Sequence, residues 1–266
     1  MQIIINKSSI AYIVIPYVLL TFFGCIKTEV DNDIDDITGE PCRDMPTFSD
    51  QRDNNLYNTV QIGDQCWLKE NLKYLPSVSP SNTTSRSSKH YYVYGYEGTS
   101  VSEAIATNNY NNYGVLYNWS AAQDACPPGW RVANDNDWKQ LEAFLGMDES
   151  DIENQAYRGI NQGNILKSRR QINSPLGGAW STAEHPRWNE HESQYGSDDF
   201  GFSGLPGGHL YSKGFERLGQ QATWWSISGG SIGIDICRSL RFNEGGIGRG
   251  YGEKESAYSI RCIRVK

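Results

Sequence analysis

The stretch from Tyr113 to Leu145 constrains the fold more than any other part of the chain. It begins with aromatic and apolar residues that alternate as in a strand with a buried face. A Pro-Pro-Gly sequence at 127–129 ends any regular element there. A short helix is predicted next, capped by Asn134 or Asp135 and ended by Gly146. The apolar stripe of this helix is Trp138, Leu141 and Leu145. The block predicts a structural nucleus and contains no reactive constellation.

The start of the chain predicts an export signal. Residues 8–23 are uncharged and largely apolar, follow one basic residue, Lys7, and are too few for a membrane span of roughly 20 residues. Gly24 and Cys25 come directly after this run, an arrangement that resembles a bacterial lipobox. By that resemblance, residues 1–24 are a lipoprotein signal peptide and Cys25 becomes a diacylated N-terminus. An ordinary signal peptide, or a membrane anchor with a chance cysteine, is the alternative.

An acidic segment follows this cysteine. Residues 26–40 carry many carboxylates and little apolar surface, which is too little to offset the entropy lost when a chain is ordered. We therefore expect residues 25–44 to form a flexible, lipidated tether. Such acidic tracts resemble the surface-export signals of Bacteroidetes lipoproteins, although a solvated spacer has the same composition. The prediction is an outer-membrane lipoprotein that is exposed on the cell surface and held to the membrane by its lipid.

Composition limits the function of the rest of the chain. The formal net charge is −7, and no basic stripe is present, so nucleic-acid binding is not expected. Residues 45–266 are enough for one well-cored domain. The chain has 16 tyrosines, 8 tryptophans and 27 glycines, which is typical of a loop-rich module that contains β-strands.

Besides Cys25, the chain has five cysteines, and disulfides form in the oxidising environment expected for an exported protein. Sequence alone does not determine their connectivity, and an odd number leaves at least one thiol free. We predict that Cys126 pairs with Cys262 and joins the central block to the last strand. We also predict that Cys42 pairs with Cys66 and closes an N-terminal hairpin. Cys237 then remains unpaired.

Most of the remaining chain predicts short strands. Residues 47–68 fit a β-meander with turns at 53–55 and 63–64. Residues 90–96, HYYVYGY, fit an aromatic strand that we expect to be buried, with an exposed row of sugar-stacking tyrosines as the alternative. The C-terminal third is a series of β segments separated by glycines, and residues 258–265 close it.

Six segments together resemble one family. In chain order they are YNTVQIGDQCWLKENL, YGVLYNWSAA, ACPPGWRVANDNDWKQLEAFLG, GFSGLPGGHL, ATWWSIS and SIRCIR. They look like successive signatures of the Fibrobacter succinogenes major paralogous domain family, over residues 45–266. The resemblance implies an exported protein or lipoprotein of Bacteroidetes or Fibrobacteres. The function of such proteins is largely unestablished, so the resemblance implies location and architecture but no mechanism.

The chain is also similar, more distantly, to C-type lectin-like domains. The similarity rests on a CPPGW turn entering a short helix, tryptophan-rich β segments and a cysteine in the final strand. It implies an α+β fold of short twisted antiparallel strands, one or two packed helices and long loops, with the N- and C-terminal strands paired. The chain lacks the Glu-Pro-Asn, Gln-Pro-Asp and Trp-Asn-Asp tripeptides of the sugar-binding lectins. Calcium-dependent sugar binding by that route is therefore not expected.

The polar loop at 184–199, EHPRWNEHESQYGSDD, is the main candidate surface. Its histidines and carboxylates are of the types that bind zinc or calcium. Their spacing matches no standard site, and we expect a solvated loop without a metal or other cofactor. Aromatic residues in a polar loop often anchor ligands. Trp188 and Tyr195, together with His191, are the predicted ligand-binding residues.

Catalysis is not expected. The chain has four histidines and no serine in a GxSxG elbow, and the reactive cysteine pair of the lectin-like formylglycine-generating enzymes has no clear counterpart. A glycosidase needs two carboxylates across a cleft, and 31 acidic residues leave that alternative open. Residues 244–253, EGGIGRGYGE, miss the spacing of a phosphate-binding loop and predict a flexible loop between strands.

The sequence therefore predicts a non-catalytic, lipid-anchored module for binding or adhesion, with a glycan or a surface protein as its partner. The first alternative is a structural component of a surface or fimbria-like assembly. The second alternative is an extracytoplasmic hydrolase.

Overall fold

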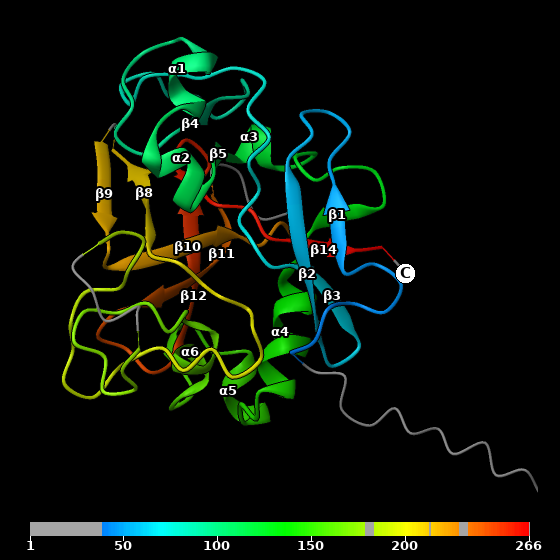
Figure 1. Ribbon diagram of the computed structural model, residues 1–266, viewed down its shortest axis with the longest axis vertical. Coiled ribbons are helices and arrows are strands. Elements are labelled where there is room, and N and C mark those ends of the chain that lie inside the picture. Colours follow the sequence, from blue (N-terminus) through cyan, green and yellow to red (C-terminus); the bar gives the residue numbers. More distant parts are fainter. Residues whose placement is uncertain (1–38, 179–183, 213, 229–233, 266) are drawn as a thin grey trace, which may run out of the picture. The chain divides into compact units, whose positions relative to one another are not determined.

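The computed structural model describes residues 39–178, 184–212, 214–228 and 234–265, which belong to one compact unit spanning residues 36–266. The predicted signal peptide, Cys25 and most of the predicted tether lie outside the described residues. Within the described ranges, no helix is long and apolar enough to cross a membrane. The fold is α+β, with mostly antiparallel sheets and short helices (Figure 1).

The first sheet has five strands in the order β1-β2-β3-β14-β6. β1 (Thr47–Ser49), β2 (Leu56–Ile62) and β3 (Gln65–Leu68) form the predicted antiparallel meander. β14 (Cys262–Arg264) lies between β3 and β6 (Trp130–Val132). The last strand therefore pairs both with an N-terminal strand and with the strand that follows the Pro-Pro-Gly turn.

The second sheet has nine strands among the described residues. Eight follow the order β4-β5-β13-β8-β10-β11-β12-β7, and β9 pairs with β8. In this sheet β8 and β10 run parallel, whereas the other pairs are antiparallel. The strands are β4 (Tyr91–Tyr92), β5 (Leu116–Asn118), β7 (Ala156–Arg158), β8 (Gly207–Tyr211), β9 (Gly214–Leu218), β10 (Gln221–Trp225), β11 (Ile234–Arg241), β12 (Ile247–Glu253) and β13 (Ala257–Tyr258).

The helices of the described chain are short, and α4 is the longest of them. They are α1 (Val101–Ile105), α2 (Asn108–Tyr113), α3 (Trp119–Ala122), α4 (Asp135–Phe144), α5 (Glu149–Ile152) and α6 (Gln162–Leu166).

Helix α4 forms as predicted. The Asn134 side chain accepts a hydrogen bond from the Asp137 N–H, and the Asp137 carboxylate accepts one from the Asn134 N–H, which completes a capping box. Trp138 and Leu141 on the predicted stripe are buried. Gly146 follows the helix with a φ of +78°, a left-handed conformation that favours glycine.

Two local predictions are wrong. The strand before the turn is limited to β5, and Trp119 begins helix α3, because the Asn118 side chain accepts a hydrogen bond from the Ala121 N–H and caps a helical turn. The glycine-rich segment 244–253 contains strand β12 rather than a loop. Because β12 pairs with both β11 and β7, cross-strand pairing outweighs the low strand propensity of glycine.

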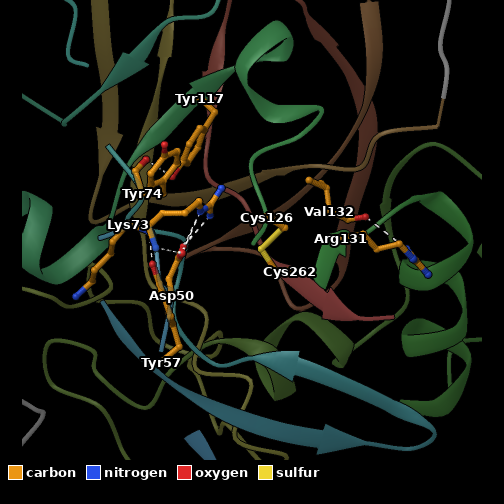
Figure 2. The surroundings of a disulfide bond; sticks show 10 residues. Asp50, Tyr57, Lys73, Tyr74, Tyr117, Cys126, Arg131, Val132 and Cys262 are labelled. Carbon is orange, nitrogen blue, oxygen red and sulfur yellow. Dashed lines mark hydrogen bonds and ion pairs between the residues drawn. A yellow bond between two sulfur atoms is a disulfide. The ribbon is translucent and has the colours of Figure 1, made fainter. Parts of the chain in front are cut away.

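Both predicted disulfides are present. Cys42 is bonded to Cys66 and Cys126 to Cys262, with Cα–Cα distances of 5.7 and 5.9 Å. Cys237 is the free cysteine of the described chain. Figure 2 shows the second bond, which links the segment after α3 to strand β14. The C-terminal strand is thus held to the central block by a covalent bond as well as by hydrogen bonds.

An aromatic cluster connects α4 to both sheets. Its members are Trp67 on β3, Trp138 on α4, Trp224 on β10, and Phe202 in the segment before β8. All four are fully buried or nearly so. Neighbouring ring centroids lie 5.3 to 5.8 Å apart, the spacing of favourable aromatic pairs. The guanidinium of Arg261 packs on this cluster, 4.3 Å from the Phe202 ring centroid. The cluster therefore provides a rigid base for Arg261.

Candidate functional site

Trp188 does not lie on the surface. Its side chain is fully buried, and its indole Nε1 donates a hydrogen bond to the Gly204 carbonyl at 3.1 Å. Its ring centroid lies 5.7 Å from the Lys167 ammonium. The prediction that Trp188 is an exposed ligand anchor is therefore wrong. The loop around it is polar, but the residues that bury the indole come from before and after that loop.

His191 and Tyr195 are both half-buried. His191 Nδ1 accepts hydrogen bonds from the N–H groups of Ser193 and Gln194, at 3.2 and 2.9 Å. This nitrogen therefore shapes the loop and is not free for a ligand. Ligand binding by His191 Nε2 and by Tyr195 stays a prediction. Within the described ranges, no group of three or more histidine, cysteine, aspartate or glutamate side chains could hold a metal ion.

A cavity of about 410 Å³ lies beyond the end of β3, and we call it the basic cavity. Five cationic side chains and two carboxylates line it, whereas the whole chain has a net charge of −7. The cavity therefore concentrates positive charge on an acidic protein. Its charged residues are Lys69, Lys73, Arg169, Arg170, Arg261, Glu70 and Asp198, and its other lining residues are Asn71, Asn111, Asn112, Tyr113, Gly114, Ser168, Ser203 and Leu205.

Four of the six segments that carry the family resemblance meet at the basic cavity. The first provides residues 69–71, and YGVLYNWSAA provides 113–114. GFSGLPGGHL provides Ser203 and Leu205, and SIRCIR provides Arg261. The sequence motifs that look most characteristic thus converge on one site, although they are spread over nearly the whole domain.

Arg261 is a buried cation without an acidic partner. Its side chain is almost fully buried, and its Nε donates to Asn71 Oδ1 at 3.0 Å. Its terminal nitrogens donate to the backbone carbonyls of Leu68, Phe202 and Ser203. No carboxylate of the described chain lies within ion-pair distance of this guanidinium. Burial lowers the pKa of Arg261 to about 10, against the charges of Glu70 and Asp198, which act in the opposite direction, so the group is still charged at neutral pH.

The two carboxylates of the basic cavity are held by hydrogen bonds. Glu70 accepts from the backbone N–H and the side-chain amide of Asn58, at 2.9 and 2.7 Å. Asp198 accepts from the N–H and the hydroxyl of Ser203, both at 2.7 Å. Burial raises the pKa of Asp198, while these hydrogen bonds and the charges of Lys69 and Arg261 act in the opposite direction. The acidic side chains therefore offset the cations of the cavity only in part.

Tyr113 connects the basic cavity to the polar loop. Its hydroxyl lies 2.9 Å from His185 Nδ1, and burial raises the pKa of Tyr113 to about 12. Gly114, which follows it, has a φ of +76°, and a Cβ atom there would lie 2.7 Å from the carbonyl oxygen of Leu72. Glycine at 114 therefore allows the end of α2 to approach the segment after β3 and to close the cavity wall.

These features define a class of protein: a disulfide-bonded α+β domain of mostly antiparallel strands, with a basic cavity built from segments spread along the chain. The chain matches the Fibrobacter succinogenes major domain over residues 60–264, and it belongs to that family. This confirms the resemblance to that family seen in the sequence, whereas the C-type lectin-like similarity stays a prediction. Comparisons with curated proteins and with solved structures gave no match.

Proposed function

We propose that the protein is a non-catalytic binding module outside the cytoplasm, and that its basic cavity binds an acidic group of a glycan. The observation that carries this proposal is Arg261, a buried guanidinium that lines the cavity and forms no ion pair among the described residues, so that Glu70 and Asp198 of the same cavity compensate its charge only at longer range. A buried charge is costly unless an opposite charge compensates it. A carboxylate or sulfate of a bound sugar supplies that charge.

The rest of the lining suits a sugar acid. Arg170 is exposed at the cavity, and its guanidinium forms no ion pair with a described residue, so its donors are available to a ligand. Arginine binds carboxylate and sulfate oxygens through two parallel hydrogen bonds. Neighbouring amides such as Asn112 both donate to and accept from hydroxyl groups. Acid recognition and hydroxyl recognition are thus available in the same cavity.

Two expectations from sequence complete the proposal. Disulfides form in oxidising compartments, so the two bonds of this chain support export. A lipid on Cys25 then holds the domain at the outer membrane. Mass spectrometry of the mature N-terminus tests the lipid, and Cys25→Ser is expected to release the protein from the membrane fraction.

A C-type lectin-like kinship is supported by the pairing of β14 with β3 and by a helix after the CPPGW turn.

The binding proposal is tested on an array that contains uronic acid glycans, sulfated glycans and their neutral counterparts. We expect binding to acidic glycans that weakens as salt rises. Arg170→Ala is expected to lower affinity at least tenfold without changing the unfolding midpoint. Arg43→Ala, at an exposed arginine outside the cavity, is the matched control. Equal binding of Arg170→Ala and the parent, or no acidic ligand on the array, contradicts the proposal.

Hydrolysis is the second candidate function, because Glu70 and Asp198 line the same cavity and glycosidases use two carboxylates. The raised pKa of Asp198 is what a general acid requires. Product analysis by chromatography after long incubation with each bound glycan separates the two functions. Intact glycan supports the binding module. Shortened glycan whose appearance is lost in Asp198→Asn and Glu70→Gln establishes the hydrolase instead.

A further inference from the structure

A second concave surface is lined by residues of β8, β9, β10, β11, β12 and β13 in the nine-stranded sheet. We call this hollow of about 280 Å³ the sheet groove. Its lining combines uncharged polar, aromatic and charged side chains of both signs. They are Gln221, Thr223, Ser239, His209, Cys237, Tyr211, Tyr251, Tyr258, Glu216, Arg217 and Arg241. The sheet groove and the basic cavity have no lining residue in common.

Strand β12 presents a row of glycines on the side of the sheet groove. Gly248 pairs with Ser239 and Gly250 with Cys237, so both glycines lie on the face that carries these groove residues. Gly252 continues the alternation. The glycines of IGRGYGE therefore share one face of the strand, and Tyr251, at an alternate position, also reaches the sheet groove.

Packing explains two of these glycines but not the third. A Cβ atom at Gly248 would lie 2.3 Å from Ser239 Oγ, and one at Gly252 would lie 2.3 Å from the Tyr258 ring. A Cβ atom at Gly250 meets nothing within 4 Å, and its φ is not in the left-handed region. Glycine in a strand costs stability of roughly 0.5–1 kcal/mol relative to alanine. A strand glycine often marks a bulge, a bend, or a place where another backbone or a ligand approaches closely. Gly250 lies in an unbroken register with β11 and has open space above it, which favours the approach of a ligand.

His209 independently indicates a ligand. Its side chain is 8% exposed and lines the sheet groove, yet its Nδ1 is buried without a hydrogen-bond partner among the described residues. Burial lowers the pKa of His209 to about 4, so the ring is neutral at pH 7 and can both donate and accept a hydrogen bond. A hydroxyl group matches such a ring, because it too is both donor and acceptor.

Tyr211 gives the sheet groove an apolar surface beside its polar side chains. It is 41% exposed at the end of β8, on the same face as His209. An aromatic ring packs well on the C–H face of a pyranose, while amide and hydroxyl groups reach its hydroxyls. Gln221, Thr223 and Ser239 supply uncharged groups of this kind.

We propose that the sheet groove binds a neutral oligosaccharide, with a sugar ring on Tyr211 and the chain passing over Gly250. Binding there goes beyond the function proposed above, because it concerns another surface and another ligand charge. The protein would then have two glycan sites, the basic cavity for an acidic group and the sheet groove for neutral sugars. The two sites would bind either one glycan or two different ones.

The test uses cellohexaose, xylohexaose, mannohexaose, maltohexaose and laminarihexaose as probes, in saturation-transfer NMR and isothermal titration calorimetry. We expect at least one of them to bind. Gly250→Phe fills the open space above β12 and is expected to weaken binding at least tenfold with an unchanged unfolding midpoint, whereas Gly250→Ala stays within twofold of the parent. Tyr211→Ala is expected to lose at least tenfold and Tyr211→Phe to recover most of the affinity.

Arg170→Ala separates this site from the basic cavity, because that change is expected to leave binding of the neutral probe unaltered. Failure of all five probes to bind overturns the inference. So does binding that neither Gly250→Phe nor Tyr211→Ala weakens.

Discussion

The Nε of Arg238 donates a hydrogen bond to Glu142 Oε1 at 2.7 Å, and neither side chain is exposed to solvent. Glu142 also pairs with the guanidinium of Arg158, at 2.8 Å. Helix α4 is thereby bound to β11 and β7 at once. Glu142 is the shared partner of these two buried cations, although Arg238 also forms an ion pair with Asp135 at 2.8 Å.

Loss of the Glu142 charge is expected to destabilise the protein strongly. Glu142→Gln leaves both guanidinium groups without full compensation in the interior, a type of change that costs about 3–5 kcal/mol. Urea unfolding followed by tryptophan fluorescence measures the change in free energy of unfolding. Glu153→Gln removes an exposed partner of Lys139 and is expected to leave the midpoint unchanged. Similar midpoints for both variants would show that Glu142 does not have this role.

The two disulfides are expected to differ in their contributions to stability. Cys126–Cys262 closes a loop of 136 residues and Cys42–Cys66 one of 24. In the chain-entropy model these values correspond to about 5 and about 3.5 kcal/mol. The double variants Cys126→Ser/Cys262→Ser and Cys42→Ser/Cys66→Ser, compared by urea unfolding without reductant, should show the larger loss for the long loop. The reverse order would mean that strain or denatured-state structure outweighs loop entropy.

The disulfides were predictable because each one involves a segment whose strand pattern is visible in the sequence. Cys42–Cys66 involves the N-terminal meander, and Cys126–Cys262 involves the final strand. The basic cavity was not predictable, because its residues meet only after folding: Asn71 and Arg261 are 190 positions apart in the chain. The motifs carried a partial signal, since the charged residue Arg261 stands between Ile260 and Cys262 in an apolar segment. Strand β12 was missed because local glycine content says nothing about the two strands that pair with it.

Trp188→Ala is expected to act on stability rather than on ligand binding alone. The indole is fully buried, and its removal leaves a cavity, while the Gly204 carbonyl keeps one hydrogen bond, from the Ser168 N–H. Truncating a buried tryptophan costs about 3–5 kcal/mol. Tyr211→Ala, at an exposed aromatic, is the comparison and should change the free energy of unfolding by about 0.5 kcal/mol or less. A Trp188→Ala variant with the same free energy of unfolding as its parent would contradict the burial of this side chain.

Acid is expected to destabilise the protein partly through His209. Its pKa falls from 6.5 to about 4 on folding, mainly because of burial and further because of the charges of Arg217 and Arg241. The folded state therefore favours the neutral ring, so the contribution to stability is complete above pH 6.5 and is lost as the pH falls toward 4. The loss amounts to roughly 3 kcal/mol at 1.36 kcal/mol per pKa unit. Unfolding free energies of the parent and His209→Gln between pH 7 and pH 4 measure it, because the variant lacks this term. Parallel pH profiles for the two proteins would mean that His209 does not titrate between these limits.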